Sequence, residues 1–161
     1  MTLWRKTRGV SMIFGRKQRH INRIMIVEDE PLIAFDNEIF LQSSGYDVIA
    51  TVNSAEEAIE ILDNRADEVE AIILDYNLAG PASGIAVAEA ARAKAIAVLF
   101  VTGECPENLG RCAIGCLAKP FPQKHLLAAL DVMEQIRAGK AVKRVPSTMT
   151  LFHPHVGPDA V

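Results

Sequence analysis

Long apolar stretches, internal repeats and low-complexity tracts are all missing from this chain of 161 residues. No run approaches the ~18 consecutive apolar residues of a membrane-spanning helix, so a membrane-embedded protein is excluded. The lack of a repeat period excludes a solenoid. A composition with 50% hydrophobic and 23% charged residues excludes a wholly disordered chain. At this length the sequence favours one domain and excludes a two-domain enzyme.

Cysteine is scarce, with only Cys105, Cys112 and Cys116 in the chain. An odd number at close spacing excludes the disulfide framework of small secreted proteins and predicts buried thiols in a reducing compartment. Their spacing is not a standard zinc pattern, even with His125 nearby, and redox sensing has no support in the sequence. The N-terminus lacks the continuous apolar core of a secretory signal, so we expect a cytoplasmic protein.

Acidic residues are absent from the first 23 positions, which hold seven of the 17 lysines and arginines. Residues 24–137 carry seven basic residues against 19 acidic ones. An acidic body disfavours nucleic acid as the main partner and suits a cation site. We therefore predict a basic flexible arm at 1–22, a folded domain at 23–138 and a flexible tail at 139–161, which shows no periodicity.

The basic arm at 1–22 allows two interpretations. Its apolar residues, interspersed among the basic ones, would suit an anionic membrane or an acidic partner. A disordered leader is the favoured reading, so membrane contact is not expected, and Met12 is an alternative start to Met1.

Five short, almost wholly apolar runs are typical of parallel strands that are covered on both faces. They lie at residues 24–27, 48–52, 71–74, 97–101 and 113–117. Helix patterns lie between them. The first starts at Pro31, continues through Leu32, Phe35 and Ile39 at helical spacing, and ends at Gly45.

The remaining helix patterns complete the alternation. Ser54 and Glu57 form a capping box at the start of the second helix. A third is expected at about 85–93 and a last one after Pro122, whereas 104–111 is barely two turns long because Pro106 and Gly110 interrupt it. Strand and helix thus alternate five times, which specifies an α/β doubly wound sheet with right-handed crossovers.

Polar residues follow four of the predicted strands at their carboxyl ends, where ligands bind in such sheets. They are Glu28 and Asp29 after the first strand, Asp75 after the third, Thr102 after the fourth and Lys119 after the fifth. Converging carboxylates repel one another, and Mg²⁺ relieves such repulsion while bridging protein oxygens to a phosphate. A carboxylate nucleophile with a hydroxyl and an ammonium beside it would suit phosphoryl transfer.

Residues 24–137 resemble the receiver domain of bacterial two-component response regulators. The resemblance rests on four motifs in this order: Glu28-Asp29, Leu74-Asp75, Val101-Thr102-Gly103 and Lys119-Pro120-Phe121. The resemblance implies a flavodoxin-like (βα)5 fold, with five parallel strands in the order 2-1-3-4-5. It implies Mg²⁺ as cofactor.

The same resemblance implies roles for individual residues. Glu28, Asp29, Asp75 and the backbone carbonyl of Asn77 would bind the Mg²⁺. Asp75 would be phosphorylated by a sensor histidine kinase, with Thr102 and Lys119 contacting the phosphoryl group. The Lys119–Pro120 bond would be cis.

Two departures from the family pattern matter. Glu28 replaces the more common Asp. Cys116 stands where the family usually carries a Tyr or Phe that swings inward on phosphorylation. Together with Phe100-Val101-Thr102-Gly103, the missing aromatic resembles a variant receiver subgroup that is associated with general stress signalling.

We therefore predict a single-domain response regulator that is a phospho-acceptor and not a conventional enzyme. It would act through contacts with an unknown downstream protein or as a phosphate sink, as a monomer or weak dimer, with no DNA-binding domain. The alternatives are a Mg²⁺-dependent phosphatase or phosphotransferase with an Asp nucleophile, a phosphorylation-independent pseudo-receiver, and a flavodoxin-like nucleotide binder. A phosphatase of the haloacid-dehalogenase type would need a second Asp where this chain has Asn77, and no glycine-rich nucleotide motif is present.

Overall fold

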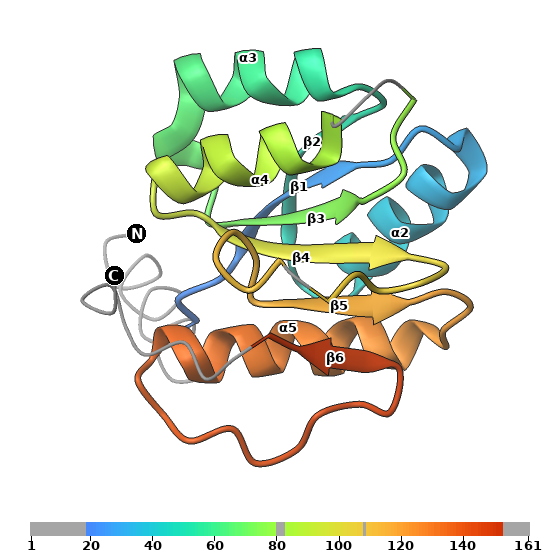
Figure 1. Ribbon diagram of the computed structural model, residues 1–161, viewed down its shortest axis with the longest axis vertical. Coiled ribbons are helices and arrows are strands. Elements are labelled where there is room, and N and C mark those ends of the chain that lie inside the picture. Colours follow the sequence, from blue (N-terminus) through green and yellow to red (C-terminus); the bar gives the residue numbers. More distant parts are fainter. Residues whose placement is uncertain (1–18, 80–82, 108, 153–161) are drawn as a thin grey trace, which may run out of the picture.

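The computed structural model describes residues 19–79, 83–107 and 109–152, whose strands form one six-stranded sheet in the order β2-β1-β3-β4-β5-β6 (Figure 1). The first five strands in this order are parallel, and β6 is antiparallel to β5. The strands are β1 (Arg23–Val27), β2 (Asp47–Val52), β3 (Ala71–Asp75), β4 (Ala97–Thr102), β5 (Gly115–Ala118) and β6 (Met149–Leu151). The helices are α2 (Pro31–Ser43), α3 (Ala55–Arg65), the 3-10 turn η1 (Ala66–Glu68), α4 (Ser83–Ala93) and α5 (Gln123–Arg137).

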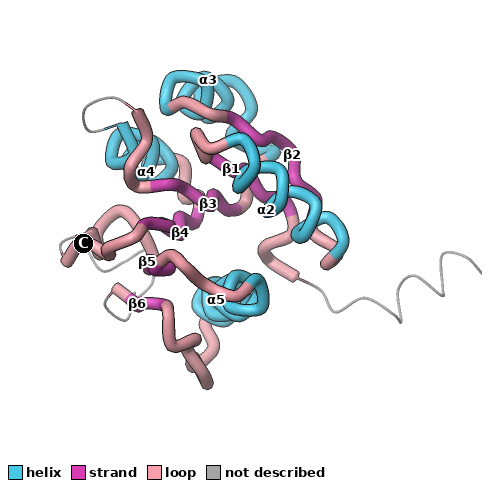
Figure 2. Tube along the Cα trace, turned by 90° about the vertical axis from the view of Figure 1, so that its right-hand side faces the viewer, coloured by secondary structure: helices cyan, strands magenta, loops and turns pink. Residues whose placement is uncertain are grey.

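The helices cover both faces of the sheet, so the sheet separates two apolar cores (Figure 2). One core contains Leu62 of α3 and Val87 of α4, and the other contains Leu41 of α2 and Leu130 of α5. Every residue of the central strands β3 and β4 is buried, which explains their continuous apolar sequence. The predicted α/β class and the order 2-1-3-4-5 of the parallel strands are confirmed. Among the described residues, none of the helices combines the length and apolarity needed to cross a membrane.

Local signals in the sequence set the helix ends. Pro31 occupies the first turn of α2, and Gly45 follows the helix with a φ of +90°, a conformation that glycine adopts without strain. The Ser54 side chain accepts a hydrogen bond of 3.2 Å from the backbone N–H of Glu57, which caps α3 as predicted. These caps position the turns that lead from β1 into α2 and from β2 into α3.

Helix α2 forms where the apolar spacing predicts it, but the spaced residues point outward. Leu32 is 80% exposed, Phe35 59% and Ile39 50%, whereas the helix buries Ala34 and Leu41. A repeat of this kind usually marks the buried face of a helix. We call these three residues the α2 stripe.

The five predicted parallel strands are present, and β6 adds an antiparallel sixth strand within the segment predicted as a flexible tail. The prediction of a flexible tail is therefore wrong for residues 149–151. Met149 and Phe152 are buried, and the Phe152 N–H donates to the Ile114 carbonyl at 3.0 Å. Three residues of strand are too few to give a periodic pattern, and apolar burial against β5 stabilises them. Residues 153–161 lie outside the described part of the chain.

The predicted basic arm is also anchored at its end. The backbone N–H groups of His20 and Ile21 donate to the Glu134 carboxylate, each at 2.7 Å, and Ile21 is buried. Arg19 lies over the ring of Tyr46, 4.7 Å from its centre. Residues 20 and 21 are thus held in place although they were predicted to belong to the flexible arm, because the sequence does not show the contact with the Glu134 carboxylate of α5. Residues 1–18 lie outside the described residues.

The prediction of three free thiols is wrong for two of them, because Cys105 and Cys116 form a disulfide while Cys112 is free and buried. The chain between β4 and β5 contains no helix among its described residues. It folds back over the sheet and buries Leu109 and Ala113. This path brings Cys105 to a Cα–Cα distance of 5.9 Å from Cys116, which a linear sequence does not reveal.

Gly115→Ala should detach β6 from the sheet. A Cβ at this position would lie 2.7 Å from the Thr150 carbonyl oxygen and 2.8 Å from the Met149 methyl group. We expect the free energy of unfolding to fall by about 1–3 kcal/mol, as in other overpacked sites. Urea denaturation measures the change, with Gly103→Ala as the control because its Cβ would meet nothing within 4 Å. Equal stability of the two variants would contradict the packing described for β6.

Candidate functional site

The predicted site residues meet at the carboxyl edge of the sheet. Asp75 is the last residue of β3 and Thr102 the last of β4, while Glu28 follows β1 and Lys119 follows β5. The backbone holds these ends in register, since the Lys119 N–H donates to the Thr102 carbonyl at 2.8 Å. The peptide bond between Lys119 and Pro120 is cis, which confirms what the resemblance implied.

A single ammonium group joins two carboxylates at this edge. Lys119 Nζ donates to Glu28 Oε2 at 3.1 Å and lies 3.6 Å from Asp75 Oδ2. Glu28 is 4% exposed and Asp75 5%. Buried carboxylates are rare unless they are paired, so the ammonium is an electrostatic requirement of this arrangement.

Asn77 connects Asp75 to Thr102. Its backbone N–H donates to Asp75 Oδ1 at 2.9 Å, and its side-chain amide donates to Thr102 Oγ1 at 3.0 Å. The resemblance implied that the backbone carbonyl of Asn77 is a metal ligand, whereas these two contacts involve its backbone N–H and its side-chain amide. Because Thr102 Oγ1 accepts from the amide, its own hydroxyl proton remains available to another acceptor.

Three carboxylates form a cluster that can hold a cation. Glu28, Asp29 and Asp75 each offer an oxygen, and these oxygens lie within 4.8 Å of one another. Glu28 and Asp75 are buried, whereas Asp29 is partly exposed. An all-oxygen donor set that is open to water on one side fits the preferences of Mg²⁺.

Burial raises the pKa of Glu28 from 4.5 to about 7, and the negative charge of Asp75 adds to the increase. The hydrogen bond from the Glu30 N–H and the contact with Lys119 oppose it without cancelling it. Burial alone lowers the pKa of Lys119, but its hydrogen bond to Glu28 and the charges of Glu28 and Asp75 outweigh this effect and raise it. The cluster therefore carries negative charge that one ammonium does not fully neutralise.

Gly84 helps to shape the turn after β3 at this site, a role that the sequence did not predict. A Cβ here would lie 2.8 Å from the Tyr76 carbonyl oxygen and 3.3 Å from that of Asp75. The absence of a side chain lets α4 pack directly against the turn after β3. A glycine directly before the helix expected at 85–93 was the available signal, because glycine is common where the backbone makes a close approach.

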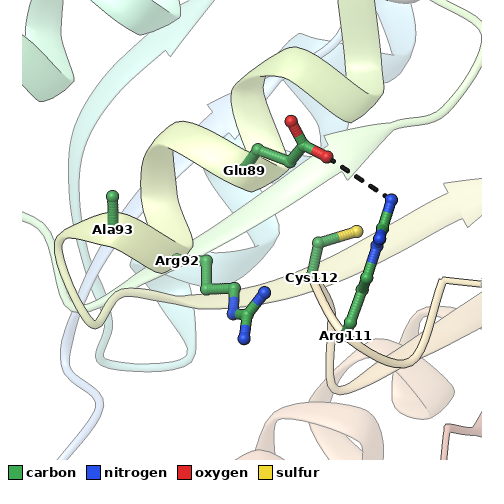
Figure 3. Close-up of a pocket in the computed structure, with 5 residues that line it drawn as sticks. All are labelled: Glu89, Arg92, Ala93, Arg111 and Cys112. Carbon is green, nitrogen blue, oxygen red and sulfur yellow. Dashed lines mark ion pairs between the residues drawn. The ribbon is translucent and has the colours of Figure 1, made fainter. Parts of the chain in front are cut away.

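A shallow pocket of about 390 Å³ lies elsewhere, lined by Glu89, Arg92, Ala93, Arg111 and Cys112 (Figure 3). Arg111 and Glu89 form an ion pair across it at 3.9 Å. The pocket shares no residue with the acidic cluster, so it is separate from the strand-end site.

Comparison with known proteins gives a consistent picture. A family model described as the response regulator receiver domain matches residues 24–131. The phyllosphere-induced regulator PhyR of Methylorubrum extorquens is 32% identical over 117 residues, which cover 67% of this chain and 42% of PhyR. This chain thus spans less than half the length of that relative.

Solved structures of similar proteins share the fold. The solution structure of SdrG from Pseudomonas melonis Fr1, in a BeF3-activated conformation, matches with a TM-score of 0.58 and 33% identity over 69% of this chain and 94% of SdrG. A structure described as the PhyR stress response regulator matches with a TM-score of 0.55 and 28% identity, over 68% of this chain and 43% of that one.

Glu28→Gln should stabilise the metal-free protein at high pH. The folded-state pKa is raised, so ionising Glu28 costs stability progressively as the pH rises from about 4.5 to about 7, and the full cost persists above. A neutral glutamine avoids this cost, which amounts to about 3–4 kcal/mol at about 1.4 kcal/mol per pKa unit.

The measurement is urea denaturation between pH 4 and 8 in the presence of a chelator. Glu60→Gln, at an exposed position of α3, serves as the matched control. The stability gain of Glu28→Gln should grow with pH and that of the control should not. A gain that does not change with pH would contradict the raised pKa.

Proposed function

Because the chain belongs to the response regulator receiver family, a family of two-component signalling, we propose that it accepts a phosphoryl group on Asp75 from a sensor histidine kinase. The observation that carries the proposal is the position of Lys119 Nζ, 3.1 Å from Glu28 and 3.6 Å from Asp75. A buried acidic residue beside a fixed ammonium combines a nucleophile with a group that offsets the charge of an incoming phosphate.

The cluster of Glu28, Asp29 and Asp75 would hold Mg²⁺, with the Asn77 carbonyl as a further oxygen donor. The fit rests on the oxygens of these three carboxylates, which lie within 4.8 Å of one another. When bound, the ion would neutralise charge between these carboxylates and the phosphoryl oxygens.

Three side chains, those of Asp75, Lys119 and Thr102, have different roles in the proposed phosphoryl transfer. An oxygen of Asp75 attacks the phosphorus of the kinase's phosphohistidine, and the electron pair of the breaking P–N bond returns to the imidazole nitrogen. Lys119 Nζ offsets charge on the transferred group. Thr102, whose oxygen already accepts a hydrogen bond from Asn77, would donate a hydrogen bond from its hydroxyl to a phosphoryl oxygen.

A role in general stress signalling follows from the variant pattern around Phe100–Thr102 and from the similarity to PhyR. The receiver would act in the cytoplasm by contact with a downstream protein or as a phosphate sink. Both outputs need a phosphorylated Asp75, so the same experiment tests their common premise.

The α2 stripe is the proposed docking surface for the kinase. Helix α2 begins at Pro31, two residues after Asp29 of the acidic cluster, so a protein that delivers a phosphoryl group to Asp75 passes this helix. Leu32, at 80% exposure, is the stripe residue nearest the cluster in sequence. Exposed apolar side chains at helical spacing suit a partner helix.

Asp75→Asn should abolish phosphoryl transfer, because an amide oxygen is a poor nucleophile and cannot form the acyl phosphate. Radiolabel transfer from the phosphorylated cognate kinase in the presence of Mg²⁺ measures the effect. Asp63→Asn, at an exposed position of α3, is the control and should behave as wild type. Labelling of the Asp75→Asn variant would refute the assignment, and continuous release of phosphate from simple phosphate esters would favour a phosphatase.

Phe35→Ser should slow transfer from the kinase about 10-fold or more, equivalent to about 1.4 kcal/mol of lost contact. Transfer from acetyl phosphate, which needs no docking surface, should not change. Gln123→Ser, at an exposed position of α5, is the control for a surface substitution elsewhere. Equal slowing with both donors would show that the substitution disturbs the site and not the docking.

A further inference from the structure

The disulfide between Cys105 and Cys116 lies between two residues of the proposed site. Cys105 stands three positions after Thr102, and Cys116 stands three positions before Lys119. We call the chain between these cysteines, residues 106–115, the crosslinked loop. Both ends of this loop therefore lead directly to groups that are proposed to contact the phosphoryl group.

The two sulfur atoms have different surroundings. Cys116 lies in β5, opposite Phe100 of β4, and is completely buried. Cys105 is partly exposed and packs against the same apolar core. The crosslink therefore ties a surface segment to the interior of the sheet.

We propose that Cys105 and Cys116 are a reversible redox pair, closed by a peroxide and opened by a dithiol, which controls the mobility of the crosslinked loop. This assigns a function to the cysteine that replaces the usual aromatic residue at position 116. The regulatory consequence rests on the proposed function, whereas the crosslink and its effect on the loop do not.

The chemistry balances with a peroxide as oxidant. The Cys105 thiolate, on the accessible side, attacks one oxygen of hydrogen peroxide, which breaks the O–O bond and yields a sulfenic acid and, after protonation, water. The Cys116 thiolate then attacks the Cys105 sulfur and releases a second water, so two thiols and one peroxide give one disulfide and two waters. A dithiol reductant returns two electrons and two protons and is itself oxidised to a disulfide.

The proposed cytoplasmic location and the partial exposure of Cys105 favour reversibility. Reductants keep most thiols reduced in the cytoplasm, where a disulfide is usually transient or redox-sensing. Because Cys105 is partly exposed, a reductant can reach that sulfur. The third thiol, Cys112, lies within the crosslinked loop but takes no part in the disulfide. It is buried, and burial raises its pKa, which disfavours the reactive thiolate.

Closing the crosslink acts on the site through the chain that follows Thr102. A phosphoryl group on Asp75 draws the Thr102 hydroxyl, and the residues after it must follow. A disulfide holds Cys105 at the buried strand β5 and prevents that movement. The oxidised protein would then accept a phosphoryl group without passing the change on to the loop.

The test uses the full chain, treated with hydrogen peroxide or with dithiothreitol. Mass spectrometry after thiol alkylation in denaturant, which also exposes the buried Cys116, should find Cys105 and Cys116 protected only in the oxidised sample. Hydrogen exchange of peptides that span 106–115 should be at least about fivefold slower in that sample. Addition of Mg²⁺ and beryllofluoride, a phosphoryl mimic, should change the exchange of these peptides in the reduced sample alone.

Matched variants separate the possible causes. Cys105→Ser and Cys116→Ala should each exchange like the reduced protein even after peroxide. Cys105→Ser changes only the partly exposed partner and leaves the buried position 116 intact. Cys112→Ala, which keeps the pair, should behave as wild type. Asp75→Asn should form the crosslink and lose only the beryllofluoride response.

Each part of the proposal would be contradicted by a different experimental result. Alkylation of both cysteines after peroxide, or equal loop exchange in the two redox states, would overturn the redox pair. A beryllofluoride response of equal size in both states would overturn its control of the site. No response in either state would refute the proposed phosphoryl site, while the alkylation and exchange results would still decide the redox pair.

Discussion

The contact between the Lys119 ammonium and the carboxylates of Glu28 and Asp75 is the constraint around which this molecule is organised. Burying two acids at one sheet edge is unfavourable, and the raised pKa of Glu28 records that cost. A sequence selected only for stability would place apolar residues here. The fold tolerates the charge because the two cores on either side of the sheet supply the opposing free energy.

Parallel pairing explains how side chains from distant parts of the sequence reach this edge. Glu28 and Lys119 are 91 positions apart, yet each follows the last residue of a strand in the same sheet. Adjacent elements then refine the geometry. Asn77 spans the gap between β3 and β4, and Gly84 lets α4 approach the turn that carries it. The precision of the site therefore comes from backbone packing as much as from the charged groups.

Much of this architecture could be predicted from the sequence because buried parallel strands leave a continuous apolar signal. The run at 71–74 corresponds to β3 (Ala71–Asp75), and the polar residue at its end pointed to the site. The strand-end rule then placed Asp75, Thr102 and Lys119 together without any contact information.

The features that escaped prediction depend on the path of the chain in three dimensions. A helical repeat of apolar residues states their spacing but not which side faces the core, so the exposure of Phe35 could not be read from it. The pairing of Cys105 with Cys116 depends on a loop that has no regular structure. Strand β6 is too short to show a period, and only its partner β5 specifies it.

Strand β6 also changes what the sheet offers to its surroundings. The outer edge of β5 would otherwise present unpaired backbone groups, which other chains can use to extend a sheet. Its antiparallel neighbour occupies those groups and exposes only three residues in their place. Among the described strands, this leaves β2 as the one long open edge, at the opposite side of the molecule from β6. Within the described residues, β2 therefore offers the longer template for strand addition by a second copy, and β6 offers only three residues on the other side.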